Sequence, residues 1–406
     1  MSKKICVFAI VCALIFTVPV CAFALPVTFG AKDVCPDSEG VNNESSIYCW
    51  TPYLLSEGSY PDIREFFNRF NITRVYQSIS EIYFQQEETA AMVKRLADDG
   101  IETVALAGER AWGLAGSDLS PIKAYIDAVR DYNSGIGADA KIEKMALDVE
   151  TFTYSAWKSD KTGYFKNYIR NMQEIYSHAR EAGLEVVQVI PAYFDSIDEE
   201  LFRVFVETCC DEISVMNYTK DTQVNEIAGE MALCRELGKK VETIFETMPY
   251  TDYYGVTEDN TYFYEGLDAV MEKRSIILQT YKYDKLSTSY HHFPTMYHVA
   301  SGRYMAEIYA YTDSGDPSRN DLGQTYELDT VILYGDDGSV VKAGLYNPNL
   351  GQDYEENCYL AVGVMPGVKY TVAAGTDNYT VTNPEKIFSF GEGELIDYTS
   401  IRIKRG

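Results

Sequence analysis

The segment Lys-Met-Ala-Leu-Asp-Val-Glu, at positions 144–150, alternates apolar residues with a second set that ends in two acids. Side chains along a β-strand point to opposite faces in turn, so a strand here places Asp148 and Glu150 on one face. In a parallel barrel the apolar set packs on the helices, while the acidic set points inward near the carboxyl end, where barrels carry their catalytic groups. The segment therefore predicts a barrel strand with two neighbouring carboxyls, which suits acid/base catalysis.

From about residue 46 the chain repeats one pattern, a short β-branched or apolar run followed by a longer amphipathic stretch. This is the pattern of βα units. The expected strands are 47–51, 73–78, 103–107, 145–150, 185–191, 212–218, 241–246 and 275–281. Several helical stretches between them end in a glycine stop signal, as at Gly100 and Gly183. Eight alternating units predict an α/β fold, a closed (β/α)8 TIM barrel.

After about residue 301 helical periodicity disappears, and short strands alternate with turn signals such as Asp336-Asp337-Gly338 and Pro366-Gly367. This predicts a small C-terminal all-β, sandwich-like domain. We therefore expect a barrel that carries the catalytic groups over 25–300 and an accessory domain over 301–406. The Tyr- and His-rich stretch 280–299 is expected to be a loop between them.

The amino terminus carries Lys3 and Lys4, an apolar run over 5–21 and then Ala22-Phe23-Ala24. Charged, apolar and small-residue regions in this order predict a signal peptide over 1–24. No later segment is apolar for long enough to span a bilayer. We expect a secreted, cell-surface or periplasmic protein with no membrane span after cleavage.

The composition is strongly acidic, with 61 acids against 35 bases and a formal charge of −26. Such a charge repels nucleic acid and anionic lipid and favours a neutral or cationic partner, although it also serves solubility. Only four histidines are present, which argues against a catalytic transition-metal site. We expect a monomer that needs no metal and no organic cofactor.

The sixth expected strand, 212–218, leads into Met216-Asn217-Tyr218-Thr219, with Met216 and Tyr218 on one face. Together with 144–150 it resembles glycoside hydrolase family 18, the chitinase family, whose fourth strand ends in Asp-x-Asp-x-Glu and sixth in Met-x-Tyr-Asp. The resemblance implies that Glu150 donates the proton, that Asp148 orients the substrate acetamide and that Tyr218 donates a hydrogen bond to it. The N-acetyl oxygen of the sugar is then the nucleophile, so no second carboxylate stands across the bond.

Two departures from the family pattern leave alternatives open. Ala146 occupies the position of the first aspartate in Asp-x-Asp-x-Glu, and Thr219 occupies that of the aspartate in Met-x-Tyr-Asp. Such losses are expected in a barrel that binds glycans without cleaving them. Retention of Glu150 favours an enzyme, whereas a structural surface protein predicts neither binding nor turnover. A second enzymatic alternative pairs Glu150 with Glu246, because many retaining glycosidases carry the nucleophile at the end of strand seven. An ion-pair or helix-capping role for Glu246 is the structural alternative.

Aromatic residues supply further candidate sugar contacts. Trp50, Trp112 and Trp157 follow strands one, three and four, and flat aromatic faces suit pyranose rings, although each also fits loop packing. The other candidate substrate-binding residues are Met216, Asn217, Tyr193, Asp195, Glu246 and Tyr281, the last near the position of the family's strand-eight tryptophan. The sequence thus predicts a secreted glycosidase that cleaves N-acetylglucosamine-containing glycans by a substrate-assisted, retaining mechanism.

Overall fold

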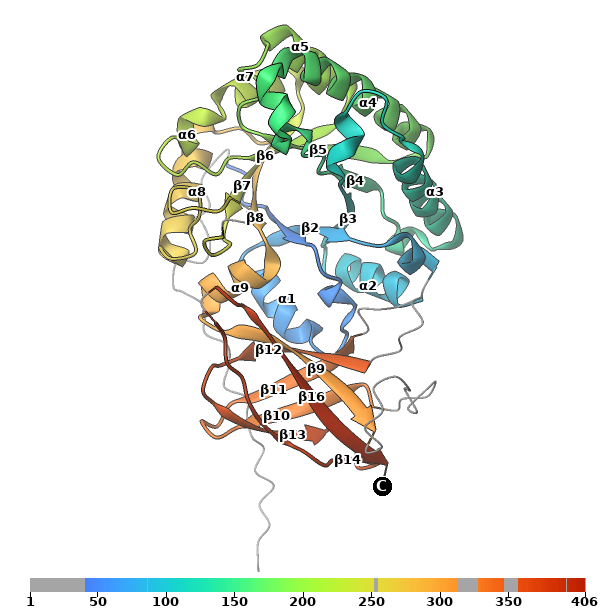
Figure 1. The fold of residues 1–406 in the computed structure, drawn as a ribbon, viewed down its shortest axis with the longest axis vertical. Helices are drawn as coiled ribbons and strands as arrows, with labels where there is room; N and C mark the ends of the chain where they lie inside the picture. The colour runs from blue at the N-terminus through green and yellow to red at the C-terminus, as the bar shows by residue number, and fades with distance from the viewer. Residues whose placement is uncertain are drawn as a thin grey trace, which may run out of the picture.

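The computed structural model describes residues 41–85, 87–251, 255–312, 328–346, 357–391 and 393–405. The expected signal peptide, 1–24, lies outside these residues, so its cleavage and the predicted export stay predictions. Figure 1 shows a ring of helices around a barrel of strands, with a second sheet against helices α1 (Tyr60–Arg69) and α9 (Phe293–Ser301). Within the described part of the chain, no helix combines the length and apolar character needed to cross a membrane.

Eight parallel strands close the predicted TIM barrel, each paired with the next, and β1 also pairs with β8. The strands are β1 (Ser45–Cys49), β2 (Ile72–Ser78), β3 (Glu102–Ala107), β4 (Lys144–Leu147), β5 (Glu185–Pro191), β6 (Glu212–Met216), β7 (Lys240–Glu246) and β8 (Leu286–His291). The first seven overlap the expected strands, because their apolar runs are bounded by clear turn and helix signals.

Helices surround the barrel and connect its strands. In addition to α1 and α9 they are α2 (Glu87–Asp98), α3 (Ser120–Gly135), α4 (Lys161–Glu181), α5 (Glu199–Thr208), α6 (Gln223–Glu226), α7 (Ala228–Leu237) and α8 (Leu267–Tyr281). Aspartate side chains cap α4 and α5: Asp160 accepts from the backbone N–H of Gly163, and Asp198 accepts from that of Leu201. Gly238 ends α7 with a φ of 66°, as its position in the sequence indicates.

The predicted eighth strand was wrong. Residues 275–281 lie in helix α8, and β8 forms within the stretch predicted to be a loop. The buried side chains of α8 are Leu267, Val270, Met271, Arg274, Ile277 and Leu278. This spacing of three and four residues is helical, so the packing of one helix face on the barrel overrides the β-branched composition of the segment.

Apolar side chains form one cluster inside the barrel and another between its strands and the surrounding helices. Met145, Leu147 and Val149 belong to the core between the strands and the helices, whereas Ala146 belongs to the cluster inside the barrel. The inner cluster consists of Tyr48, Tyr76, Val104, Leu106, Ala146, Val187, Val189 and Ile244. The alternation read from residues 144–150 therefore holds, and the layer above Ala146 at the carboxyl end is where acidic side chains face inward.

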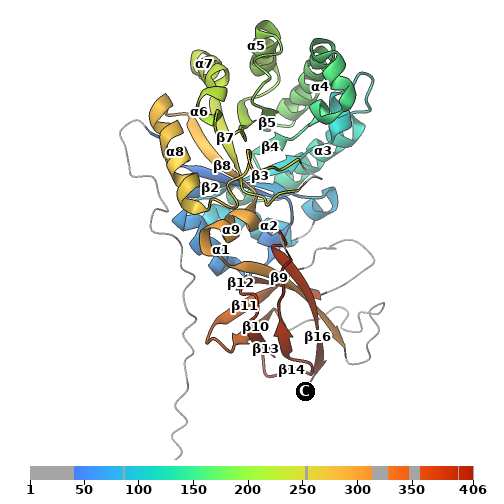
Figure 2. The same ribbon diagram turned by 60° about the vertical axis from the view of Figure 1, so that its left-hand side comes forward.

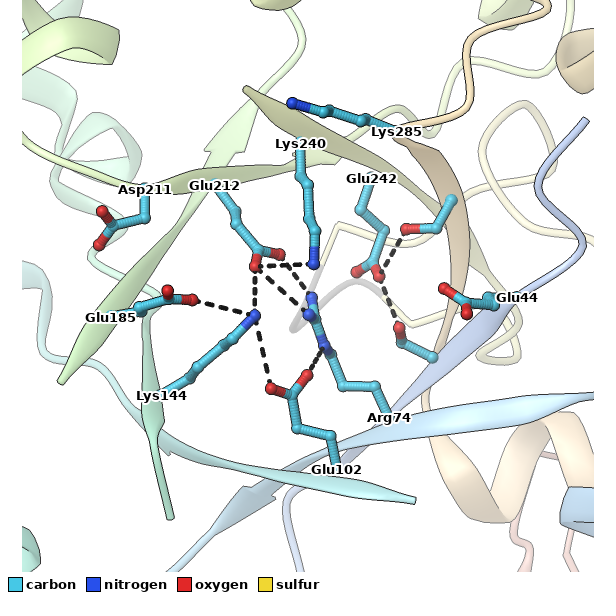
Figure 3. A network of polar contacts seen from close by, with 12 residues as sticks. Glu44, Arg74, Glu102, Lys144, Glu185, Asp211, Glu212, Lys240, Glu242 and Lys285 are labelled. Atoms are coloured by element: carbon cyan, nitrogen blue, oxygen red, sulfur yellow. Dashed lines mark hydrogen bonds and ion pairs between the residues drawn. The ribbon is translucent and has the colours of Figure 1, made fainter. Parts of the chain in front are cut away.

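A network of charged side chains closes the amino end of the barrel (Figure 3). Glu212 Oε2 lies 2.7 Å from Arg74 Nη1, its Oε1 lies 2.5 Å from Lys144 Nζ, and Glu102 Oε2 lies 2.6 Å from Arg74 Nε. Burial alone would raise the pKa of the Glu212 carboxyl, but Arg74 and Lys144 outweigh it and hold the pKa at about 2. Because these charges are paired with one another, this end serves the stability of the barrel.

The C-terminal strands form one hydrogen-bonded sheet in the order β14-β16-β9-β12-β11-β10-β13-β15. They are β9 (Tyr304–Thr312), β10 (Thr330–Gly335), β11 (Val340–Tyr346), β12 (Asn357–Val364), β13 (Lys369–Ala374), β14 (Tyr379–Val381), β15 (Glu385–Ile387) and β16 (Ile396–Arg405). Pairing is antiparallel except between β16 and β9. The sheet curls around its own apolar core, so the predicted all-β C-terminal part is present as a single curled sheet.

The curled sheet packs on the segment between β1 and α1, and Figure 2 shows the sheet below helices α1 and α9. The hydroxyl of Tyr53 donates to Glu307 Oε1 at 2.9 Å, and that of Ser56 donates to the carbonyl of Gly344 at 3.0 Å. Gly58 and Gly344 face each other so closely that a Cβ on Gly344 would lie 2.5 Å from the Cα of Gly58. Glycine at both positions therefore permits this contact.

Candidate active site

A cavity of about 500 Å³ opens at the carboxyl end of the barrel. Its lining consists of Tyr48, Trp50, Asp148, Glu150, Val189, Met216, Tyr218, Ile244, Glu246, Met248, Val256, His291 and His292. Six of these were singled out from the sequence: Asp148, Glu150, Tyr218, Met216, Trp50 and Glu246. They come from four different strand ends, so the barrel brings together residues that are far apart in the chain.

The end of β4 fixes the two acids through its backbone. The N–H of Asp148 donates to the carbonyl of Ala107 at 2.9 Å, which continues the pairing with β3 beyond the last strand residue. Val149 is fully buried in the outer core, so its neighbours Asp148 and Glu150 point to the other side, into the cavity. Gly108 allows this approach, because a Cβ there would lie 2.1 Å from the carbonyl oxygen of Asp148.

Burial makes both acids of this pair bind protons more tightly. Burial, with the charge of Glu150, raises the pKa of the Asp148 carboxyl to about 7, and His291 partly offsets this. Burial also raises the pKa of Glu150, against the lowering effects of His291 and Arg110. Oδ1 of Asp148 is buried and has no hydrogen-bond partner among the described residues. The pair can therefore hold a proton near neutral pH, as a general acid requires.

Tyr218 brings a hydroxyl to the same cavity from the loop after β6. Burial, followed by the charges of Glu246, Asp148 and Glu150, raises the pKa of its phenol well above the ordinary value. The hydroxyl therefore stays protonated and able to donate a hydrogen bond. Met216, at the end of β6, adds an apolar surface beside it.

Glu246 is held by two partners at the end of β7. Its Oε2 lies 3.0 Å from Nδ1 of His291, and its Oε1 accepts from the backbone N–H of Met248 at 2.8 Å. Nε1 of Trp50 donates to the other ring nitrogen of His291 at 3.1 Å. Trp50 remains 37% exposed and stands at the rim of the cavity.

Cationic side chains are scarce at this site. Of the described residues that line the cavity, none is Lys or Arg, so His291 and His292 are its basic groups. Burial and the neighbouring His291 lower the pKa of His292 to about 3, and its side chain caps helix α9 through Thr295. No group of three or more metal-binding side chains occurs among the described residues.

Two of the three tryptophans do not lie in the cavity. Trp157 is 1% exposed and stacks on Phe194 at 5.9 Å, so it belongs to the core between strands and helices. Trp112 packs partly buried against the same core, and its carbonyl accepts from Asn171. Apolar packing holds both indoles, so neither of these two predicted sugar-binding residues belongs to the cavity lining.

Four other sequence candidates also lie away from the cavity lining. Asn217 is fully buried and donates to Gln223 and Thr243, because the residue between Met216 and Tyr218 must point outward. Tyr281 ends helix α8, and its hydroxyl donates to a backbone carbonyl of α6. Asp195 packs against Gly229 at the start of α7. Tyr193 packs on Phe152 and Phe194, although its pKa is raised to about 12 by burial and by Glu150.

His291 is the principal residue that sequence reasoning missed. It ends β8, in the stretch predicted to be a loop, and it contacts Trp50 after β1, Tyr218 after β6 and Glu246 at the end of β7. The run 286–291, which alternates within an otherwise aromatic stretch, is the signal that predicts this strand. Tyr48 was missed as well, and its hydroxyl donates to Ser214 at 2.9 Å inside the barrel.

No family model and no curated protein matches the chain. Solved structures with a similar fold include a glycoside hydrolase family 18 chitinase from Cycas revoluta in complex with (GlcNAc)3, at 10% identity and a TM-score of 0.40, covering 61% of this chain and 94% of that one. A chitinase from Bacteroides thetaiotaomicron matches at 10% identity and a TM-score of 0.39, covering 60% of this chain and 88% of that one. D-psicose 3-epimerase from Clostridium cellulolyticum matches at 13% identity and a TM-score of 0.37, covering 61% of this chain and 84% of that one. The similarity is one of barrel fold only.

Proposed function

We propose that this protein is a glycoside hydrolase that cleaves N-acetylglucosamine-containing glycans by a substrate-assisted, retaining mechanism. The observation that carries the proposal is the convergence of Asp148, Glu150 and Tyr218 on one cavity that is rimmed by the exposed indole of Trp50. An acid pair that holds a proton near neutrality and a phenol that stays protonated are the groups that this mechanism uses.

Each group has one task in the proposed reaction. Glu150 gives its proton to the glycosidic oxygen while the acetamide oxygen of the substrate attacks the anomeric carbon and the glycosidic bond breaks. Asp148 and Tyr218 hold the acetamide in position for this attack. Water, deprotonated by the Glu150 carboxylate, then opens the oxazolinium intermediate, so the anomeric configuration is retained and Glu150 regains its proton.

The surroundings of the acid pair support this division of roles. Glu246, the other carboxylate of the cavity, is engaged by His291 and by the backbone of Met248, so it is less suited to act as a nucleophile. The aromatic and apolar lining, including Tyr48 and Met216, fits the apolar face of a pyranose ring. Export to the secreted, cell-surface or periplasmic space, with glycan as the partner, is part of the same proposal.

Turnover of fluorogenic N-acetylglucosaminides and N-glycans tests the proposal, with wild type compared with Glu150→Gln. We expect kcat to fall by about 10²–10⁴-fold, because general acid catalysis contributes an effect of this size. The matched control is Glu143→Gln, since Glu143 is exposed and precedes β4 at the opposite end of the strand. Circular dichroism and thermal unfolding verify that the variants are folded.

Two further outcomes separate the alternatives. We expect no hydrolysis of glucosides that lack the acetamide. We also expect NMR of the early reaction products to show the retained anomer. Glycan binding without hydrolysis by either wild type or Glu150→Gln would contradict the enzyme proposal and support a glycan-binding barrel. Equal turnover of substrates with and without the acetamide would instead contradict the substrate-assisted step.

A further inference from the structure

We propose that His291 is a positioning residue that couples Trp50 to the acid pair: its neutral ring holds Trp50, and its protonated ring supplies the counter-charge facing Asp148 and Glu150. The inference deepens the proposed function, and its catalytic consequence rests on that function. The coupling itself concerns a proton and a hydrogen bond, so it can be measured without turnover.

The hydrogen bonds at the two ring nitrogens define the neutral state. An indole N–H is only a donor, so the 3.1 Å contact from Trp50 Nε1 requires an unprotonated Nε2 on His291. The ring proton then lies on Nδ1 and is donated to Oε2 of Glu246 at 3.0 Å. Glu246 thereby selects the tautomer that can hold Trp50.

Protonation of His291 removes one of these two bonds. With hydrogens on both nitrogens the ring keeps its bond to Glu246 but can no longer accept from Trp50. The indole of Trp50 is then released from the hydrogen bond that it donates to His291, at a rim position where 37% of the residue is exposed. The charged imidazolium remains facing the carboxyls that line the same cavity.

Titratable groups from several elements surround His291. They are Glu246 from β7, Asp148 and Glu150 from the end of β4, Tyr48 from β1, Tyr218 after β6, and His292. Burial lowers the pKa of His291, but the three carboxylates outweigh it, so the net shift is upward. In return, the charge of His291 lowers the pKa of both Asp148 and Glu150. Arg110 also lowers the pKa of Glu150, but it does not belong to the residues that line the cavity.

Trp50 fluorescence measured against pH tests the coupling, in wild type, Trp50→Phe, His291→Gln and Glu246→Gln. We expect wild type to show a titrating component of the emission that is absent from Trp50→Phe, because release of the indole from His291 changes its surroundings. The same component is expected to be absent from His291→Gln, since glutamine does not titrate.

Glu246→Gln is the variant that distinguishes the proposed coupling from a purely structural role for His291, because a purely structural role predicts no shift of the midpoint. Loss of the carboxylate removes the largest favourable charge beside His291, so we expect the midpoint of the Trp50 component to fall by about 1–3 pH units. A component that persists in His291→Gln, or a midpoint that is unchanged in Glu246→Gln, overturns the inference. If His291→Gln does not fold, the Glu246→Gln midpoint decides alone.

The catalytic consequence has its own readout. Removal of the His291 charge raises the pKa of Asp148 and Glu150, so both limbs of the pH profile of kcat/KM are expected to move to higher pH in His291→Gln. A uniform loss of kcat with unmoved limbs contradicts the counter-charge role. Absence of turnover in wild type counts against the proposed function only, because the fluorescence titration stands independently of it.

Discussion

A Cβ atom on Gly108 would lie 2.1 Å from the carbonyl oxygen of Asp148. This contact between the end of β3 and the end of β4 sets the position of the backbone that carries both candidate acids. Because the obstructing atom belongs to the backbone, a side chain at position 108 can be accommodated only if one of the two strand ends moves.

We therefore expect Gly108→Ala to lower turnover by about 10²-fold, the effect of displacing a reacting group by about 1 Å. Overpacking is also expected to lower the free energy of unfolding by roughly 1–3 kcal/mol. Gly135→Ala is the matched control, because an added Cβ there meets nothing within 4 Å at the end of α3. Full activity of Gly108→Ala would show that the position of Asp148 does not limit the reaction.

The hydrogen bonds of Glu246 lead to a second prediction, about which carboxylate takes part in the chemistry. If Glu246 acts through His291, Glu246→Gln is expected to lose no more than about tenfold of its acetamide-dependent turnover. This loss is much smaller than the loss of about 10²–10⁴-fold expected for Glu150→Gln. If Glu246 is the nucleophile, its loss abolishes turnover and added azide restores it in Glu246→Ala. Steady-state kinetics of the three variants with and without azide separate the two mechanisms.

The strands that hold the acids and Tyr218 could be predicted because each side chain there has one possible face. In 144–150, every second residue is apolar and enters the outer core, so Asp148 and Glu150 have no other direction than inward. The same alternation after β6 places Met216 and Tyr218 in the cavity and turns Asn217 away from it. The period of two also shows why Asn217 was a poor candidate.

The parts that were missed depend on tertiary packing. Residues 275–281 are rich in β-branched residues, yet they form a helix because Ile277 and Leu278 complete a buried helical face. This misplacement of strand eight concealed His291, which is the last residue of the true β8. Trp157 lies at the predicted end of the barrel but turns into the core, and nothing in the local sequence specifies the direction of a loop side chain.

The amino end of the barrel provides a third prediction. At neutral pH, Glu212→Gln removes the most buried carboxylate that Arg74 and Lys144 share, so we expect a loss of roughly 3–5 kcal/mol in the free energy of unfolding. Glu185→Gln is the control: that carboxylate also contacts Lys144, at 3.1 Å, but is 48% exposed, and its loss is expected to stay below about 1 kcal/mol.

The pH dependence of this contribution follows from the lowered pKa of Glu212. Its stabilisation is fully present above the pKa of the unfolded chain, about 4.5, and is lost as pH falls toward about 2. Chemical denaturation between pH 2 and pH 7 is therefore expected to show a steeper acid loss for wild type than for Glu212→Gln. Parallel curves would mean that the Glu212 carboxyl does not titrate differently in the folded state.

Glu230, on α7, is expected to produce the opposite pH dependence. Both its carboxyl oxygens are buried without a hydrogen-bond partner among the described residues, and burial together with Asp195 raises its pKa to about 9. In the folded protein the carboxyl therefore keeps its proton at pH values where the unfolded chain, with a pKa of about 4.5, has lost it. Wild type is thus expected to lose stability as pH rises from about 4.5 to 9, by up to about 1.4 kcal/mol per pH unit.

Glu230→Gln removes this titration, so we expect the variant to be more stable than wild type near pH 9 and to lose that advantage near pH 4. Glu236→Gln is the control on the same helix, because Glu236 is exposed, and it should retain the wild-type slope. Urea unfolding at several pH values gives both slopes. If Glu230→Gln and wild type show the same slope, the Glu230 carboxyl is ionised in the folded protein, and a cation or water must reach it.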